Sequence, residues 1–324
     1  MRRWRSAAAA IGAITVLAII VTGVSATACR AQEISRPIRI VVPFAPTGFP
    51  DRLGRILAKY LSESLNQRVY VENKPGAGGI LGSLDVAHSE PDGTSLLISS
   101  LPSQVITPLI NPKAGFNTFK DFTHIAYIGG PPNCFIAATD SKLKTFDDLV
   151  KAAHAAPVSY GTAGVGTLGH IFAEYVAHKD DLKLIHVPYN GPMIGDVMSG
   201  VVDFGSLVMS TVVGSVQGGK VRALAVASDK RLPDFPDVPT FRELGFDISA
   251  VNWLTLSGPA GMPAPLVTRI NHDVNEALAR PEVRETLRRE LIEPIPVSPE
   301  EVTKLMKSET ERWAPIVAAA GLGK

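Results

Sequence analysis

Three glycines are spaced as in a dinucleotide-binding loop: Gly164-x-Gly166-x-x-Gly169 lies between a strand-like run and a helix-like run. In such a loop the backbone approaches a pyrophosphate at a helix N-terminus, and an acidic residue about 20 positions further on binds the ribose. The next predicted strand ends instead in Tyr189-Asn190, without a carboxylate. What remains is a helix N-terminus whose N–H groups favour a negative charge. We therefore expect this loop to bind an anion smaller than a dinucleotide.

Two polar side chains near this loop each have two interpretations. His170 opens the predicted helix, so it is either a donor to an anion or a solvated residue of the first turn. Tyr189 follows a predicted strand, so its ring and hydroxyl either line a binding cleft or pack at the strand end. Both side chains are candidates for ligand binding.

A second glycine-rich helix start occurs at residues 73–79, and it is either a turn or a second set of backbone donors, including Ala77 and Gly78. Ser100 and Ser103 follow the third predicted strand, where their hydroxyls bind either a ligand or the turn itself. Two glycine-rich loops with neutral donors suit a carboxylate that must be released again, because charge-assisted pairs are roughly twice as strong.

The sequence lacks the patterns expected of a catalytic or metal site. Ser206 lies in Asp-Phe-Gly-Ser-Leu, which is not the Gly-x-Ser-x-Gly elbow of hydrolases. The 7 histidines include no His-x-x-x-His pair and the 2 cysteines form no Cys-x-x-Cys pair. We therefore expect a binding protein with no catalytic residues, no metal and no cofactor.

Composition and the N-terminus indicate where the protein works. Lys plus Arg number 32 and Asp plus Glu 31, which leaves no basic excess for binding nucleic acid or a membrane surface. Residues 1–31 combine an arginine-rich start, an apolar run and small residues, as in a secretory signal peptide. A membrane anchor is the alternative, because the run approaches the roughly 18 residues that can span a bilayer. Ala28-Cys29 also resembles a lipoprotein site, so lipidation of Cys29 and cleavage near Gln32 both stay open.

Predicted strands alternate with predicted helices, which favours parallel α/β sheets with ligands beyond the carboxyl ends of the strands. The run Gly129-Gly130-Pro131-Pro132 predicts a crossing between domains, and residues 249–261 form an apolar strand expected to return to the first sheet. The length of 324 residues also exceeds what one hydrophobic core usually serves. We expect two α/β lobes joined by two crossings, with a cleft between them that encloses a small molecule.

Five segments resemble, in collinear order over nearly the whole mature chain, the Bug-type extracytoplasmic solute receptors, which are the periplasmic binding proteins of tripartite tricarboxylate transporters. These segments are residues 36–61, 69–100, 187–204, 218–246 and 312–321. The resemblance implies a two-lobed periplasmic-binding-protein fold of type II. It also implies a receptor that encloses a small organic acid and passes it to one large and one small integral membrane subunit, without catalysis.

By position, the resemblance implies a first-lobe ligand loop that includes Thr47, Gly48, Phe49 and Asp51. Asp51 also begins the first predicted helix, where a plain capping role is the alternative. Thr47 and Pro50 depart from the family pattern Pro-Gly-Gly-x-Thr-Asp, and Pro50 removes a hydroxyl and an N–H. Phe49 adds an aromatic surface beside the cleft mouth.

In the second lobe, the segments that include Gly166, Thr167, His170 and Asn190 match the family well. Leu207-Val208 stands where the family often has polar residues. This departure from the family pattern favours a less polar ligand than citrate.

We predict a monomeric periplasmic receptor for a small organic carboxylate that is weakly polar or aromatic. Residues 32–131 and 250–324 are expected to form lobe 1, and residues 132–249 lobe 2. A ligand-sensing receptor that docks onto a periplasmic sensor domain and a secreted α/β enzyme are the alternatives. The predicted ligand-binding residues are Thr47, Gly48, Phe49, Asp51, Ala77, Gly78, Ser100, Ser103, Gly166, Thr167, His170, Tyr189 and Asn190.

Overall fold

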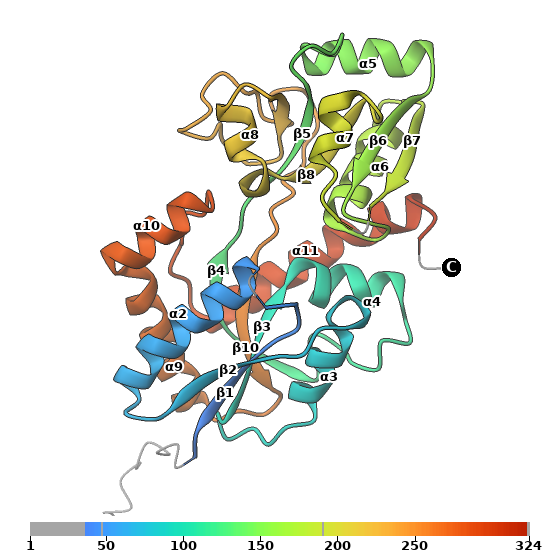
Figure 1. Cartoon of the computed structure of the whole chain (residues 1–324). Coiled ribbons are helices and arrows are strands. Elements are labelled where there is room, and N and C mark those ends of the chain that lie inside the picture. Colours follow the sequence, from blue (N-terminus) through green and yellow to red (C-terminus); the bar gives the residue numbers. More distant parts are fainter. Residues whose placement is uncertain (1–35, 47, 190, 323–324) are drawn as a thin grey trace, which may run out of the picture. The chain divides into compact units, whose positions relative to one another are not determined.

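The computed structural model describes residues 36–46, 48–189 and 191–322. The predicted signal peptide and the predicted ligand residues Thr47 and Asn190 lie outside these ranges. The described chain contains two five-stranded sheets (Figure 1).

The first sheet has the strand order β2-β1-β3-β10-β4. Strand β1 pairs in parallel with β2 and β3, whereas β10 is antiparallel to both β3 and β4. Most residues of β1 and the central residues of β3 are apolar and fully buried, as in strands that are covered on both faces: Ile38, Ile40, Val41 and Val42 in β1, and Leu96, Leu97 and Ile98 in β3. The strands are β1 (Ile38–Val42), β2 (Val69–Asn73), β3 (Ser95–Ser100), β4 (Phe122–Gly129) and β10 (Leu254–Pro259).

The second sheet has the order β7-β6-β8-β5-β9. Strand β6 is parallel to β7 and β8, whereas β5 is antiparallel to β8 and β9. Its core surrounds Phe135 of β5, whose ring centre lies 5.0 Å from that of Phe204 and 4.9 Å from that of Phe241. The strands are β5 (Asn133–Ala138), β6 (Val158–Thr162), β7 (Leu184–Pro188), β8 (Phe204–Val208) and β9 (Val221–Val226).

The expectation of parallel sheets is wrong for the strands at the crossings. The chain leaves the first sheet along β4 and returns to it along β10, so these neighbours run in opposite directions. It enters the second sheet along β5 and leaves it after β9, and these strands are antiparallel for the same reason. The pattern of alternating strands and helices does not contain this information, because neither crossing includes a helix.

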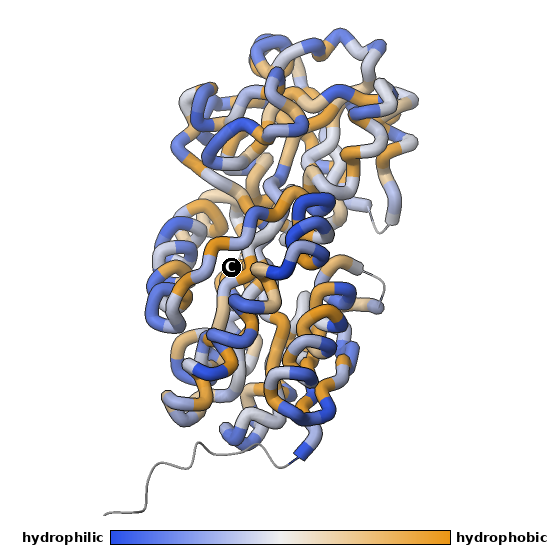
Figure 2. Tube along the Cα trace, turned by 90° about the vertical axis from the view of Figure 1, so that its left-hand side faces the viewer, coloured by the Kyte–Doolittle hydropathy of each residue, from blue (hydrophilic) through white to orange (hydrophobic). Residues whose placement is uncertain are grey.

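Helices flank both sheets, and Figure 1 shows α2 and α9 next to each other beside the first sheet. Figure 2 shows that the helices carry both hydrophilic and hydrophobic residues, as expected for helices with one buried face. None of the described helices has the length and apolar character needed to cross a membrane. The helices are α2 (Phe49–Ser64), α3 (Ile80–Ala87), α4 (Thr107–Ile110), α5 (Phe146–Ala155), α6 (Leu168–Lys179), α7 (Ile194–Ser199), α8 (Val213–Gln217), α9 (Ala264–Ala279), α10 (Pro281–Arg289) and α11 (Pro299–Ala319), with short helical turns at Ala77–Gly79, Pro102–Ile106 and Met209–Thr211.

Helix α11 contacts β4 of the first sheet and also α6, a helix that contacts β8 of the second sheet. Its start is capped as the sequence predicts: Glu301 N–H donates to Ser298 Oγ at 3.3 Å, and Ser298 N–H donates to Glu301 Oε2 at 2.7 Å. Further along, the indole N–H groups of Trp313 and Trp253 both donate to the buried carboxylate of Glu309. The hydrogen bond from Trp253 attaches the segment before β10 to α11, and α11 itself packs on β4 and α6.

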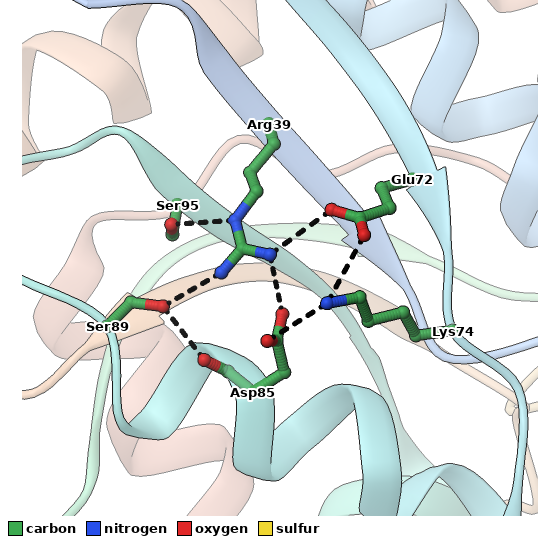
Figure 3. Close-up of polar contacts among 6 residues, drawn as sticks. All are labelled: Arg39, Glu72, Lys74, Asp85, Ser89 and Ser95. Atoms are coloured by element: carbon green, nitrogen blue, oxygen red, sulfur yellow. Dashed lines mark hydrogen bonds and ion pairs between the residues drawn. The ribbon is translucent and has the colours of Figure 1, made fainter.

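A charged cluster joins β1, β2 and α3 (Figure 3). The Arg39 guanidinium lies 2.7 Å from Asp85 Oδ2 and 3.1 Å from Glu72 Oε2, and Lys74 Nζ lies 3.0 Å from Asp85 Oδ1. Two cations and two anions balance within the cluster, and Ser89 and Ser95 accept the remaining guanidinium hydrogen bonds. The cluster is therefore balanced in charge and is a structural element of the first sheet.

Candidate functional site

A cavity of about 630 Å³ is lined by loops and helices that flank the first sheet and by strands and loops of the second sheet, and we call it the cleft. Its size is in the range typical of small-molecule sites. None of the described residues that line it is charged, and Leu207 and Val208 contribute to an apolar wall. The lining residues are Phe44, Ala77, Gly78, Ile80, Pro102, Thr107, Ile110, Asn111, Asn133, Ala163, Val165, Gly166, Thr167, Leu168, Gly169, Ser206, Leu207, Val208, Thr211 and Asn252.

The two crossing segments run antiparallel beside the cleft. Asn133 N–H donates to the Ala250 carbonyl at 2.8 Å, and Asn252 N–H donates to the Pro131 carbonyl at 2.9 Å. The segments approach so closely at Gly130 that a Cβ there would lie 2.1 Å from the Asn252 carbonyl oxygen. Only glycine fits this position without a backbone shift.

The glycine loop before α6 presents the N-terminus of a 12-residue helix to the cleft. Thr167 is the N-cap: its hydroxyl accepts from His170 N–H and donates to the Gly164 carbonyl at 2.8 Å. The next two N–H groups, those of Leu168 and Gly169, have no intrahelical acceptor because they belong to the first turn. No other described residue accepts from them. These two N–H groups are available to an anion in the cleft.

Gly166, the second glycine of the motif, has a different role from the one its spacing suggests. Its N–H donates to Nδ1 of the buried His170 at 3.1 Å. The His170 ring stacks on His186 with the ring centres 3.9 Å apart. Burial lowers the pKa of His170, and burial together with His170 lowers the pKa of His186 to about 4. His170 is therefore a neutral acceptor that shapes the loop from behind, and it does not line the cleft.

The glycine-rich segment between β2 and α3 borders the cleft opposite the start of α6. Ala77 and Gly78 both line the cleft and both have positive φ, 48° and 65°. The Gly78 carbonyl accepts from the Thr107 hydroxyl at 3.2 Å, which anchors the turn. No described residue accepts from the N–H groups of Ala77 and Gly78. Backbone donors from the turn before α3 and from the start of α6 thus border one cavity.

Ser100 and Ser103 are buried and bind each other. The Ser103 Oγ accepts from Ser100 N–H at 3.1 Å, and the Ser100 Oγ accepts from Ser103 N–H at 3.2 Å. Neither residue lines the cleft. The geometry favours the turn interpretation of these hydroxyls.

Gly48 and Phe49 line a second cavity of about 400 Å³, which shares Val208, Thr211 and Asn252 with the cleft. The Arg52 guanidinium lies 5.9 Å from the centre of the Phe49 ring. The predicted first-lobe loop therefore borders a cavity that adjoins the cleft.

Asp51 and Tyr189 contact neighbouring side chains and line neither cavity. The buried Asp51 carboxylate accepts from Arg55 Nε and from Asn73 Nδ2, each at 3.0 Å. The Tyr189 hydroxyl donates to Asp196 at 2.8 Å. Ligand binding by these two residues stays a prediction.

Sequence reasoning missed several polar residues of the cleft. Asn133 and Asn252 come from the two crossing segments, and Ser206 comes from β8. The only signal in the sequence was the position of both asparagines beside predicted crossings. In the described part of the chain, no group of three or more His, Cys, Asp or Glu side chains could hold a metal ion.

Comparison with known proteins assigns the chain to a family. A family model described as "Tripartite tricarboxylate transporter family receptor" matches residues 53–322. The chain is 35% identical over 319 residues to the "UPF0065 protein in tcbD-tcbE intergenic region" of Pseudomonas sp. (strain P51), covering 95% of this chain and 94% of the relative. It is 30% identical over 315 residues to BugT of Bordetella pertussis, covering 95% and 97%.

Solved structures agree with these sequence matches. R. palustris Rpa4515, solved with adipate, superposes with a TM-score of 0.78 at 28% identity over 89% of this chain and 98% of that chain. MatC of Rhodopseudomonas palustris, solved with malate, superposes with a TM-score of 0.75 at 28% identity over 87% and 99%. The predicted periplasmic-binding-protein fold is confirmed.

Proposed function

The chain belongs to the tripartite tricarboxylate transporter receptor family, and from that premise we propose that it binds a small organic carboxylate in the cleft. Receptors of this family are solute-binding proteins of the periplasm. One observation carries the proposal: N–H groups without an acceptor among the described residues line one uncharged cavity from two separate segments, the turn at Ala77-Gly78 and the start of α6 at Leu168-Gly169.

We call the N–H groups of Leu168 and Gly169 the cradle, and these donors differ from Gly166 and Thr167, the residues of this loop that the sequence predicts to bind the ligand. Gly166 N–H is bound to His170, so the carboxylate would be bound by the two N–H groups that follow Thr167. The positive end of the α6 dipole favours an anion at this point. The opposite end of the ligand would contact Leu207, Val208 and the cavity beside Phe49.

The proposed mechanism is closure about the crossing segments. We assign residues 32–131 and 250–324 to one lobe and residues 132–249 to the other. A ligand that contacts donors of both lobes binds the closed state better, and it shifts the population toward that state by its difference in affinity. No reaction is needed for this function, and we assign no catalytic residue.

The proposed location and partners follow from the family and the N-terminal sequence. Residues 1–31 carry the pattern of a signal peptide, with lipidation at Cys29 as the alternative to simple cleavage. The monomeric receptor would pass its ligand to one large and one small integral membrane subunit.

The proposal is tested by removing one donor from the cradle. Leu168 is the first residue of α6, where proline is tolerated because no intrahelical bond is lost, and Thr167 has φ −71° and ψ 159°, which suits the residue before a proline. Leu168→Pro deletes the N–H, whereas Leu168→Ala deletes the same packing and keeps the N–H. A charge-assisted hydrogen bond contributes roughly 1.5–3 kcal/mol, so Leu168→Pro should weaken carboxylate binding about 10- to 100-fold relative to Leu168→Ala.

The ligand is found first, by a thermal-shift screen of the mature chain against di-, tri- and aromatic carboxylates. A carboxylate at 100 times its dissociation constant stabilises the protein by roughly 2.7 kcal/mol. Equal affinities in the proline and alanine variants would contradict the cradle, and no shift with any carboxylate would contradict the proposed ligand class.

A further inference from the structure

Asn133 carries a buried hydrogen-bond acceptor at the cleft that no described residue satisfies. The residue is fully buried and lines the cleft, and its side-chain oxygen has no hydrogen-bond partner among the described residues. Its backbone groups are both used, since its N–H donates to the Ala250 carbonyl and its carbonyl accepts from Ala227 N–H. A buried acceptor without a partner is costly, so its presence at a binding cavity requires an explanation.

The orientation of the Asn133 amide follows from its neighbours. The Ser206 hydroxyl lies 2.7 Å from the Gly169 carbonyl, which can only accept, so the single hydroxyl proton is directed to that carbonyl. Ser206 Oγ must therefore accept from Asn133, and the Asn133 amide nitrogen donates to it at 2.9 Å. A flipped amide would place two acceptors against each other. The unsatisfied atom is therefore the Asn133 oxygen.

Asn252 repeats the feature on the other crossing segment. It also lines the cleft, and its side-chain oxygen is likewise buried without a described partner. The two segments are joined beside these residues by the Asn133 and Asn252 backbone hydrogen bonds. Two unsatisfied acceptors thus occur where the crossing segments border the same cavity.

A carboxylate cannot satisfy these oxygens, because it only accepts hydrogen bonds. A ligand hydroxyl can. An ammonium group would be a poorer match, since no acidic side chain lines the cleft among the described residues and a desolvated cation needs a charged partner. The hydrogen-bond chain from Asn133 through Ser206 ends at Gly169 of the α6 first turn, so the acceptor lies near the proposed carboxylate cradle.

We propose that Asn133, oriented by Ser206 and joined by Asn252, is an acceptor subsite for a ligand hydroxyl, so that this chain is a receptor for hydroxycarboxylates. The inference rests on the proposed carboxylate-binding function and narrows its substrate class. Asn133 is then a specificity-determining residue, because an acid without the hydroxyl leaves the buried oxygen unsatisfied.

The test compares acids that differ only at one carbon. Titration calorimetry measures the affinity of the mature protein for malate, 2-fluorosuccinate, succinate and aspartate, and for 3-phenyllactate with its fluoro, unsubstituted and amino counterparts. Fluorine has nearly the size of a hydroxyl but donates no hydrogen bond. In at least one series the hydroxy acid should bind about tenfold more tightly than the other three.

Asn133→Leu removes the subsite at nearly constant volume, and the preference for the hydroxy acid should disappear. The matched control is Asn275→Leu, because Asn275 also has an unsatisfied side-chain oxygen but lies on α9 and does not line the cleft. The preference should persist in the control. If Asn133→Leu does not fold, Asn252→Leu is the variant to measure. The comparison of the four acids on the wild-type protein tests the hydroxyl preference without any variant.

The possible results distinguish failure of the hydroxyl subsite from failure of the proposed carboxylate binding. Binding of acids with no preference for the hydroxyl, or a preference that survives in Asn133→Leu, would overturn the inference and leave a carboxylate receptor. Tighter binding of the amino acids would overturn the choice of a hydroxyl over an ammonium. Absence of binding by all carboxylates in the wider screen would overturn the proposed function and this inference with it.

Discussion

Replacing Gly169 by alanine should destabilise the protein and weaken ligand binding together. Gly169 is the second residue of α6, and a Cβ built there would lie 2.4 Å from the Ser206 carbonyl oxygen of β8. The contact must open by about 1 Å to reach an ordinary van der Waals separation. The clashing atom belongs to the backbone of β8 and not to a flexible side chain, so the N-terminus of α6 has to move to relieve the contact.

The magnitude follows from two opposing terms. Overpacking against a rigid neighbour costs up to about 3 kcal/mol. Alanine gains at most about 1 kcal/mol over glycine from its helix propensity. The expected net loss for Gly169→Ala is about 2 kcal/mol in the free energy of unfolding.

Gly195→Ala is the matched control. Gly195 is also the second residue of a helix, α7, and a Cβ there would meet nothing within 4 Å. The same substitution should therefore stabilise the protein there by about 0.5–1 kcal/mol. Urea unfolding followed by circular dichroism measures both variants against the wild type.

Ligand affinity should fall at least about tenfold in Gly169→Ala, because the shift displaces the Leu168 and Gly169 N–H groups from the cradle. It also lengthens the hydrogen bond from Ser206 to the Gly169 carbonyl. A Gly169→Ala protein as stable as Gly195→Ala would refute the close packing of α6 on β8. A destabilised Gly169→Ala protein with unchanged affinity would refute the placement of the cradle at this helix.

Two further predictions concern stability away from the cleft. Burial lowers the pKa of His124 from 6.5 to about 4, so the unfolded chain binds a proton at a higher pH than the folded protein does. The free energy of unfolding should therefore fall by about 3 kcal/mol as the pH drops from about 6.5 to about 4. Urea unfolding at a series of pH values measures this dependence, and the free energy of unfolding should depend less on pH in His124→Gln. Asp85 bridges Arg39 and Lys74, so Asp85→Asn should cost about 1 kcal/mol at low salt and less at about 1 M NaCl. Asp147→Asn, which removes a more exposed pair with Lys151, should cost less than about 0.5 kcal/mol, and equal costs for the two variants would contradict the role of the Arg39 cluster.

Local patterns in the sequence predict the elements around the site well. The capping box at Ser298 predicts the start of α11, and the glycine motif predicts a strand, a loop and a helix N-terminus at the cleft. Gly166 and Thr167 both line the cleft, as do Ala77 and Gly78. These features follow from interactions within a few residues, which spacing alone encodes.

The polar partners of the site depend on contacts between distant segments. The Gly166 N–H is bound by His170, which is only four residues further on, but the His170 ring stacks on His186 of β7, and no pattern within the loop contains that second contact. Asn133 and Ser206 are far apart in the sequence and meet because β5 pairs with β8. The spacing of the glycines indicated a loop that approaches an anion, but which N–H groups remain available depends on the tertiary structure.

The uncharged lining of the cleft has a consequence for how a receptor releases its ligand. An arginine in the cleft would form a strong pair with a carboxylate, but it would also have to be desolvated whenever the cleft closes without ligand. Neutral N–H groups at Ala77, Gly78, Leu168 and Gly169 favour an anion through their dipoles, at a smaller desolvation penalty. Discrimination among anions must then come from the remaining polar atoms of the cleft. The fixed acceptor on Asn133 accounts for such discrimination, because it distinguishes acids by a group that the carboxylate cradle does not contact.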